Sequence, residues 1–513
     1  MENPVRGSGC ARNTRTHNRF GEHMRWLHAL RSARWDRWSP LAVGLGAAFA
    51  MAARLTLPHP VGMANNGDAQ RLMCQIGADA GSPPVPSARW FFVRFRYPVE
   101  RRPAGCDGYP TTQIVQLRLT AWLHHHVFGL SGRVDLRETI VEYCLLVGVV
   151  MAIAAVLLAS VRRTARFAVL AALFLLLGEA TFADYAASPY SEAAALYGLL
   201  IFAVAAVVAA ARGRGRRAAF LVAWGGALLA VGAKTETVTL AVPLALFLGT
   251  QRFEAGWLRG RMRSRAVPAL CVLSLAATGA WSLTHESQSD LRTNVGNELT
   301  MTMMPTAADP GAMAVGLGLP RSFGRYSGTN WWSPHPIEDD PLYPRYQHRF
   351  TQANLGGYLA AHPLLADRVL SGGAGAFWLF RNTNIGTYPM GAGYIPESQE
   401  CRMCLLLKAA HAMQWTGFPG VLVVWGVCLT LAGRLVRTSR QGSRRRAFGL
   451  VSLLLTGCAV AQYITAVYGE GNEVTKHLAV ALFATALAYV WLAAGAAHTP
   501  AADDLAQPVA VRG

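Results

Sequence analysis

Short polar motifs interrupt this apolar sequence at positions where their side chains could do chemistry at a membrane surface. The first is Asn65-Asn66-Gly67-Asp68, followed one helical turn later by Arg71. Partial desolvation just above a bilayer raises the pKa of a carboxylate and suits it to general-base catalysis. We therefore predict Asp68 as a catalytic residue and Arg71 as a substrate-binding residue. The same Asn-Gly-Asp sequence is also typical of an ordinary turn or a helix N-cap.

A second motif joins two apolar segments between residues 184 and 192. Asp184 and Glu192 flank this turn, with Tyr190 between them. Two acids beside a tyrosine at a membrane boundary favour a metal site or a site for sugar hydroxyls, so all three are candidate substrate-binding residues. The alternative is local, because Pro189 is tolerated at a helix start and Glu192 interacts favourably with the helix dipole.

Two further motifs place lysines beside acids. Lys234 and Glu236 lie between two apolar segments, where ionisable groups are costly unless they are paired or functional. Snorkelling or a local ion pair explains them equally well. Glu473 lies three and four residues before Lys476 and His477, so a helix would place the three on one face. Lys476 is then suited to pair with a phosphate, and Glu473 and His477 to contact hydroxyls. A capped helix start with a local ion pair is the alternative.

A late polar region adds Arg321, Arg325 and Trp331 as candidate substrate-binding residues. Tryptophans stack on sugar rings, and arginines bind phosphates bidentately. The same residue types also serve loop packing and membrane-interface anchoring.

The elements that must position these motifs are apolar segments about long enough to cross a bilayer. The chain has 513 residues, of which 52% are hydrophobic and 15% charged, which predicts an all-α polytopic membrane protein. We expect about ten transmembrane helices, near residues 41–57, 139–161, 166–183, 189–211, 218–234, 237–250, 266–284, 413–433, 447–468 and 475–495. Two large extracytoplasmic loops carry interfacial helices, one of them at 111–128, where Val115, Leu119 and Trp122 recur at helical spacing.

Charge patterning orients these helices. Arginine-rich connections alternate with connections that carry nearly all the acids, and short arginine-rich loops stay cytoplasmic. The formal charge of +19 is explained by these loops, so we expect a lipid bilayer and no nucleic acid as partner. The bias toward alanine, arginine and glycine suggests a bacterial plasma membrane protein with both termini cytoplasmic. The expected divisions are a basic N-terminus at 1–40, helices one to seven at 41–284 with the first exterior loop at 58–137, a second exterior loop at 285–411, helices eight to ten at 412–497, and a disordered tail at 498–513.

Four cysteines fall in the expected exterior loops, where an oxidising environment permits disulfides. Cys74–Cys106 and Cys401–Cys404 bridges are one interpretation, and no bridges at all is another. A zinc site is disfavoured because the first pair lacks metal-ligand spacing.

Taken together, the layout resembles the GT-C superfamily of membrane glycosyltransferases, which use polyprenyl-phosphate-linked sugars. The shared features are an acid in a long first exterior loop, interfacial helices in that loop, and short later turns on the same side. Pro189-Tyr190-Ser191-Glu192 is similar to a Tyr-Ser-Glu segment near a luminal turn in some GT-C mannosyltransferases.

The resemblance implies a hexosyl- or pentosyltransferase that inverts the anomeric carbon and acts on a cell-envelope glycan or lipid acceptor. Asp68 would accept the proton of the acceptor hydroxyl, and Lys476, Arg321 or Arg325 would hold the leaving lipid phosphate. Asn-Gly-Asp stands where many members have paired acids, so no metal ligands are assigned and Mg²⁺ or Mn²⁺ is left open as a cofactor. The alternatives are a transporter or flippase of lipid-linked saccharides, an envelope polysaccharide ligase or polymerase, and a non-catalytic scaffold.

Overall fold

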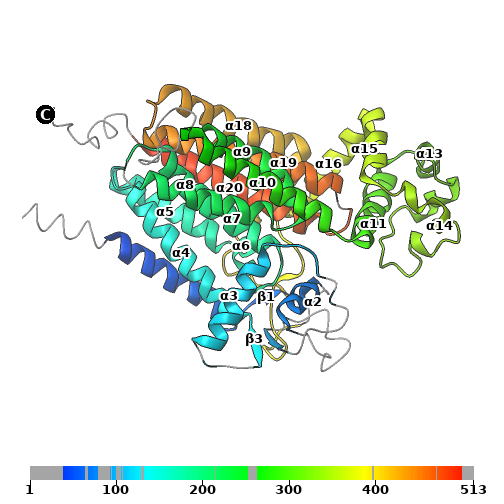
Figure 1. Cartoon of the computed structure of the whole chain (residues 1–513), viewed down its shortest axis with the longest axis horizontal. Coiled ribbons are helices and arrows are strands. Elements are labelled where there is room, and N and C mark those ends of the chain that lie inside the picture. The colour runs from blue at the N-terminus through cyan, green and yellow to red at the C-terminus, as the bar shows by residue number, and fades with distance from the viewer. Residues whose placement is uncertain are drawn as a thin grey trace, which may run out of the picture.

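Long, roughly parallel helices form the body of the protein, with two smaller parts attached at one end (Figure 1). The computed structural model describes residues 39–63, 68–78, 93, 95–99, 106, 108–127, 129, 132–213, 215–251, 263–395, 398–469 and 471–498. The predicted basic N-terminus, Asp107, the arginines at 252–262, Glu470 and the C-terminal tail lie outside these residues.

Apolar helices were expected in ten ranges, and all ten are helical. They are a first helix (Ser39–Thr56), α4 (Arg137–Leu157), α5 (Arg163–Gly178) with α6 (Ala180–Ala183) and the 3-10 helix η3 (Asp184–Ala187), α7 (Glu192–Ala210), α8 (Arg216–Val231), η4 (Thr235–Leu240) with α9 (Ala241–Thr250), α10 (Arg263–His285), α17 (Leu405–Met413) with α18 (Gly417–Thr438), α19 (Arg444–Gly469) and α20 (Val474–Ala497). Among the described residues, 7 helices are long and apolar enough to cross a membrane, and 8 if the bent pair of α5 with α6 and η3 is one span. The protein is therefore a multi-pass membrane protein, while ten crossings stay a prediction because η4 with α9 is a shorter apolar helix.

The centre of the bundle is built on α7 and α20, whose side chains are almost all buried. Small residues allow close packing here: a Cβ atom on Gly198 of α7 would lie 2.5 Å from the backbone nitrogen of Ala230 in α8. Close approach through small residues is how helices gain packing energy where the surrounding lipid is as apolar as the side chains. These contacts fix the depth at which the polar starts of α7, η4 and α20 lie.

At one end of the bundle, the segment between the first helix and α4 contains α2 (Asp68–Met73), β2 (Arg96–Pro98), α3 (Gln113–His126) and β3 (Arg133–Asp135). β2 and β3 form an antiparallel pair, and β1 (Gly62–Met63) pairs with β4 (Ile385–Thr387), which ties this segment to the one that precedes α17. On α3, Val115, Leu119 and Trp122 are exposed, while Thr120 and His124 are buried. An apolar outer face is what the predicted interfacial helix requires.

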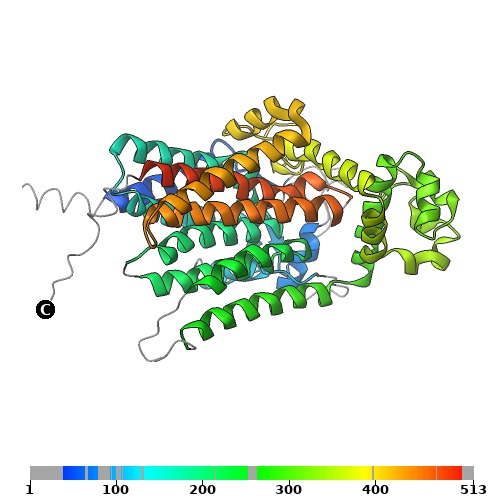
Figure 2. The same ribbon diagram turned by 90° about the horizontal axis from the view of Figure 1, so that it is seen from above.

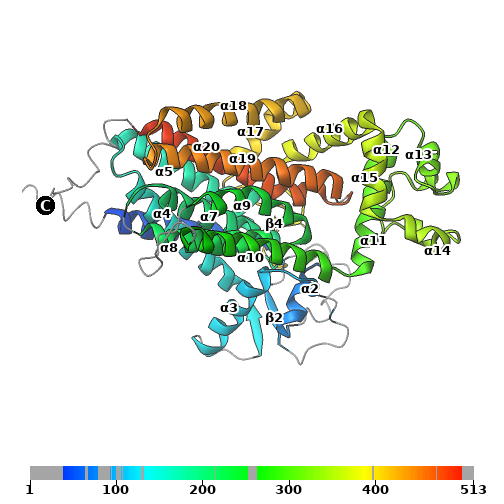
Figure 3. The same ribbon diagram turned by 45° about the horizontal axis from the view of Figure 1, so that its top comes forward.

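A second part, which we call the lobe, comprises residues 288–361. It contains α11 (Gln288–Asn297), the π-helix η5 (Glu298–Met303), α12 (Met304–Thr306), α13 (Pro310–Gly316), η6 (Arg321–Tyr326), η7 (Ile337–Asp339), α14 (Tyr343–Tyr346), η8 (Gln347–Arg349) and α15 (Gln352–Ala361). Figure 2 and Figure 3 show the lobe beyond the end of the bundle, with α13 and α14 farthest out.

The chain then returns to the bundle through α16 (Pro363–Leu379), which packs against α18, α19 and α20. Tyr463 donates a hydrogen bond to Leu370 O at 2.8 Å, and Tyr468 to Ala366 O at 2.7 Å. Treating 285–411 as one exterior loop is therefore too simple, and the final helical block begins at Leu405 rather than at 412. Hydropathy misses α16 because Asp367 and Arg368 interrupt its apolar sequence.

Three arginine-rich connections meet at one end of the bundle, and the acids Glu192 and Glu236 meet at the other. Arg212 N donates to Gly442 O at 2.8 Å, and Arg444 Nη1 donates to Leu157 O at 3.1 Å, so three arginine-rich connections meet. Glu192 and Glu236 meet at the other end, through His477. The assignment of the arginine-rich end to the cytoplasm stays a prediction.

Candidate functional site

Four charged or ionisable side chains from three distant segments meet at the acidic end of the bundle. We call Glu192, Lys234, Glu236 and His477 the lysine–histidine cluster. Lys234 Nζ lies 2.7 Å from Glu236 Oε1 and 3.9 Å from Glu192 Oε1. His477 Nδ1 lies 2.9 Å from Glu236 Oε2 and 3.5 Å from Glu192 Oε1. Residues from three separately predicted motifs therefore lie together in the structure.

The cluster is built where three helices begin. Glu192 is the first residue of α7, Glu236 lies in the first turn of η4, and His477 in the first turn of α20. The break before η4 is fixed locally, because Lys234 is extended and its backbone N–H donates to Thr237 Oγ1 at 3.0 Å. Helix N-termini carry partial positive charge, so this point stabilises carboxylates and attracts an anionic ligand.

His477 gives the cluster a movable proton. Its Nδ1 atom lies 3.3 Å from Lys234 Nζ as well as 2.9 Å from Glu236 Oε2. A protonated Nδ1 donates to the carboxylate, whereas an unprotonated Nδ1 accepts from the ammonium group. The cluster can therefore accommodate two proton arrangements with little movement of heavy atoms.

Glu473 and Lys476 extend the cluster toward its open edge. Lys476 Nζ lies 2.7 Å from Glu473 Oε2 and 4.7 Å from the centre of the Tyr190 ring. Asn384 Nδ2 donates to Glu473 Oε1 at 3.1 Å. Glu473 has a φ of 53°, a left-handed conformation that is uncommon outside glycine and concentrates at functional sites. Its side chain is 28% exposed, which makes it the most accessible acid in this group.

The segment that carries Asp68 is tied to the same region through Arg71. Arg71 Nη2 lies 2.5 Å from Asp290 Oδ2, and its guanidinium lies 5.0 Å from the centre of the Tyr109 ring. Tyr109 in turn donates to Ser191 Oγ at 3.1 Å, next to the start of α7. Asp68 begins α2, and its side chain lies outside what the structure describes. Three residues before Arg71, it shares a helix face with that arginine.

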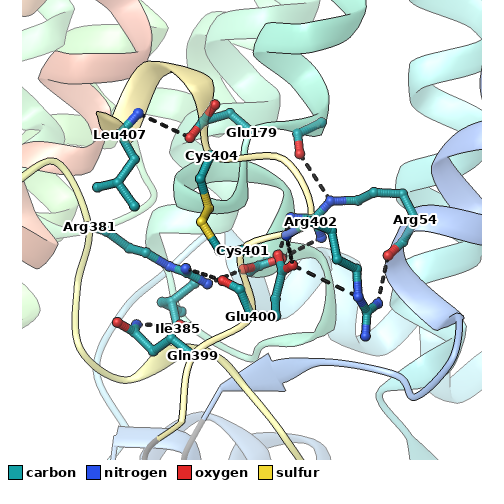
Figure 4. Close-up of polar contacts among 12 residues, drawn as sticks. Arg54, Glu179, Arg381, Ile385, Gln399, Glu400, Cys401, Arg402, Cys404 and Leu407 are labelled. Atoms are coloured by element: carbon teal, nitrogen blue, oxygen red, sulfur yellow. Dashed lines mark hydrogen bonds and ion pairs between the residues drawn. A yellow bond between two sulfur atoms is a disulfide. The ribbon is translucent and has the colours of Figure 1, made fainter. Parts of the chain in front are cut away.

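Asp184 belongs to a different group of charges, which we call the arginine network: Arg54, Asp184, Arg381 and Glu400. Arg54 Nη1 lies 2.5 Å from Asp184 Oδ1, and Arg381 Nη2 lies 2.6 Å from Asp184 Oδ2. Arg54 also pairs with Glu400, and both carboxylate side chains are 0% exposed. Figure 4 shows Arg54 and Arg381 reaching Glu400 from opposite sides, beside the Cys401–Cys404 bridge. Substrate binding by Asp184 is therefore not supported, because arginines occupy both of its oxygens.

The arginine network fastens the segment around residue 400 to the bundle. Arg402 donates to Arg54 O and His59 O, both at 2.7 Å, and Glu179 accepts from Leu406 N at 3.0 Å. Burial raises the pKa of Glu400 to about 7, with Asp184 adding to the rise and Arg54 opposing it. Sequence reasoning missed this network. Arg54 in an apolar span was the available signal, since a buried charge there requires a partner.

The arginines predicted for the second loop lie in the lobe, away from Lys476. Arg321 pairs with exposed Asp309 at 2.6 Å, and Arg325 pairs with Asp340 at 2.8 Å. The Trp331 ring packs edge-on against Tyr343, with 5.8 Å between ring centres. Figures 1 and 3 both place α13, against which η6 packs, and α14 beyond the end of α20. These three side chains have their partners within the lobe.

Comparison with known proteins identifies the family. Residues 29–506 match the family described as the YfdI N-terminal transmembrane domain. The chain belongs to this family. No curated protein and no solved structure shows significant similarity to the chain.

The YfdI N-terminal transmembrane domain family match covers the bundle and the lobe together, and its description agrees with the multi-pass helical architecture.

The four cysteines of the predicted exterior loops form the bridges Cys74–Cys106 and Cys401–Cys404, and not a zinc site. Within the described parts of the chain, no group of three or more His, Cys, Asp or Glu side chains is placed to hold a metal ion. A divalent cation therefore stays an untested prediction.

Proposed function

We propose that this membrane protein transfers a sugar from a polyprenyl-phosphate donor to a cell-envelope glycan or lipid acceptor, with inversion at the anomeric carbon. The supporting observation is the meeting of three helix N-termini at the lysine–histidine cluster, with Lys476 beside it. Such a point offers positive potential to a phosphate and carboxylates to sugar hydroxyls.

Lys476 is the candidate contact for the donor phosphate. Without substrate, its charge is balanced by Glu473 at 2.7 Å, and the Tyr190 ring packs beside it. A donor phosphate would replace part of the contact that Lys476 makes with Glu473, and the Glu473 carboxylate would then turn toward sugar hydroxyls. The Glu473 side chain is 28% exposed and that of Lys476 only 4%, so a lipid-borne ligand would reach Lys476 when Glu473 turns aside.

Asp68 is the candidate general base. In the proposed step, its carboxylate takes the proton from the acceptor hydroxyl, whose oxygen bonds to the anomeric carbon. The bond between that carbon and the phosphate oxygen breaks, and polyprenyl phosphate leaves with the electron pair. Lys476 and the helix N-termini stabilise the charge that develops on the phosphate. Arg71 contacts the ring of Tyr109, whose hydroxyl donates to Ser191 Oγ, and this links the helix that Asp68 begins to the start of α7.

A flippase of lipid-linked saccharides would need polar groups along the membrane-spanning length of its path. In α7, residues 194–209 are apolar except for Tyr197. The ionisable side chains of α7 and α20 instead lie at the helix starts. This distribution supports chemistry at one surface more than passage across the bilayer.

The test is the mass of envelope glycans from a strain that lacks the gene, complemented with wild type or with Asp68→Asn. We expect the deletion to remove one sugar mass, and Asp68→Asn to fail to restore it, since loss of a general base costs about 10²- to 10⁴-fold in rate. Glu338→Gln, which changes an exposed carboxylate in the lobe, should restore the sugar fully. Full restoration by Asp68→Asn would exclude Asp68 as base, and unchanged glycans in the deletion strain would exclude the transferase.

A further inference from the structure

The lobe contains its own pocket, separate from the lysine–histidine cluster. The pocket has a volume of about 480 Å³ and lies between η6 and the segment that follows it. Its polar lining comes from Arg325, Tyr326, His335, Asp339 and Asp340. This volume falls in the range of ordinary small-ligand sites.

The charges of this pocket disfavour a phosphate. Arg325 Nη2 already donates to Asp340 Oδ2 at 2.8 Å, so the single guanidinium in the lining is neutralised. Asp339 adds a second carboxylate. Two acids against one arginine repel a dianion, whereas hydroxyl groups can donate to Asp339 and accept from Arg325.

The pocket is held in shape before any ligand binds. Tyr326 donates to Asp340 Oδ2 at 2.8 Å, and Leu342 N donates to Asp340 Oδ1 at 2.8 Å. Burial acts to raise the pKa of Asp340, but the hydrogen bonds from Leu342, Tyr326 and Arg325 outweigh it, so the pKa lies below its ordinary value. Both oxygens of Asp340 are occupied and the Arg325 guanidinium lies 5.0 Å from the centre of the Tyr326 ring, so these groups shape the pocket. Asp339, His335 and the remaining N–H groups of Arg325 are left to contact a ligand, and such donors and acceptors suit the hydroxyls of a saccharide.

The lobe also contacts the bundle beside the lysine–histidine cluster. Gln352 Nε2 donates to Gly469 O at 3.4 Å, just before the turn that carries Glu473. The backbones touch as well, because a Cβ on Gly471 would lie 1.9 Å from Asn297 O. The lobe that carries the pocket is therefore attached to the bundle at the α19–α20 turn.

We propose that the pocket between Arg325 and Asp340 binds a saccharide unit of the acceptor, at a distance from the unit that receives the new sugar. The acceptor role rests on the proposed function, whereas saccharide binding by the pocket does not. A second point of attachment would favour polymeric acceptors over single sugars, because the second contact is made intramolecularly.

The test measures saccharide binding to the full-length protein in detergent by saturation-transfer difference NMR. The probe is the neutral oligosaccharide fraction released by mild acid from the envelope glycan of the producing organism. We expect wild type and Glu338→Gln to bind equally. The double variant Asp339→Asn with His335→Ala should bind about tenfold more weakly, as expected for the loss of one or two hydrogen bonds. In the transfer assay, the same double variant should raise KM for the acceptor and leave KM for the donor unchanged.

Equal binding by wild type and the double variant would overturn the proposal, and so would displacement of the oligosaccharide by inorganic phosphate. The two proposals fail separately. Binding that depends on Asp339 and His335 in a protein without transfer activity supports the pocket and contradicts the transferase. Intact transfer with unchanged oligosaccharide binding in the double variant contradicts the pocket and leaves the transferase supported.

Discussion

The arginine network and the lysine–histidine cluster are both buried groups of charges at the same end of the bundle, yet they are built differently. In the arginine network, planar guanidiniums contact both oxygens of Asp184 at 2.5 and 2.6 Å. In the lysine–histidine cluster, Lys234 contacts Glu236 at 2.7 Å but lies 3.9 Å from Glu192. In the arginine network, both oxygens of Asp184 are occupied by short contacts. In the lysine–histidine cluster, the contacts are longer, and His477 can change partners.

This difference indicates a structural role for the arginine network and a ligand-binding role for the lysine–histidine cluster. Guanidiniums stay charged in proteins and hold carboxylates in a fixed geometry, which suits fastening one segment to another. Lysine and histidine exchange protons and move more easily, which suits ligand binding. We therefore expect substitutions in the arginine network to reduce stability, and substitutions in or beside the lysine–histidine cluster to reduce transfer.

The largest effect is expected for Asp184→Asn. This change leaves the guanidiniums of Arg54 and Arg381 buried with one charge partner fewer, and breaking a buried pair costs about 3–5 kcal/mol. The free energy of unfolding, measured by chemical denaturation in mixed micelles, should fall by that amount. Asp309→Asn, which alters an exposed pair in the lobe, should leave it unchanged. A fully stable Asp184→Asn protein that lacks transfer activity would reverse the assignment of the two groups.

A smaller effect, on kinetics alone, is expected for Lys476→Gln. Loss of the charge that faces Glu473 and the donor phosphate should raise KM for the donor about tenfold, which corresponds to about 1.4 kcal/mol. Lys476→Arg should recover part of the loss. The matched control is Lys408→Gln, because Lys408 is exposed on α17. Initial rates at varied donor concentration give the answer, and an unchanged KM for the donor in Lys476→Gln would remove this lysine from phosphate binding.

Much of the bundle could be predicted because hydropathy reports directly on burial in lipid. Helical spacing placed Glu473, Lys476 and His477 together, and the separation of arginines from acids indicated which segment ends meet. The structure adds that Glu192 and Glu236 share His477. A single sequence does not carry this information, because it depends on how three helices pack.

The arginine network and the lobe were less accessible to sequence reasoning for the same physical reason. Arg381 and Glu400 find their partners more than a hundred residues away, at Asp184 and Arg54. Arg325 was assigned to the lipid phosphate on residue type alone, whereas its partner Asp340 comes from its own loop. Residue type indicates what a side chain can bind, but packing decides which partner is within reach.

Another buried acid, Glu298 in the lobe, extends the comparison because the described residues place no cation beside it. Its Oε2 atom has no hydrogen-bond partner among the described residues. Burial raises the pKa of Glu298 from its ordinary value of 4.5 to about 8, and the hydrogen bond from Gln352 opposes this only in part. The folded protein therefore holds this proton between pH 4.5 and 8 while the unfolded chain has released it. The resulting contribution to stability is fully present below pH 4.5 and is lost as pH rises through about 8.

Glu298→Gln should remove this pH dependence, because the amide keeps the shape of the protonated acid and does not ionise. Between pH 5 and pH 9, the Tm of wild type should fall relative to that of Glu298→Gln by several degrees, because each pH unit between the two pKa values is worth about 1.4 kcal/mol of stability. Thermal unfolding curves of both proteins at several pH values provide the measurement. Parallel dependence of the two Tm values on pH would mean that Glu298 ionises freely in the folded protein. The burial of Glu298 without a cation would then not alter its ionisation, and the comparison with the paired acids Asp184 and Glu236 would lose its physical basis.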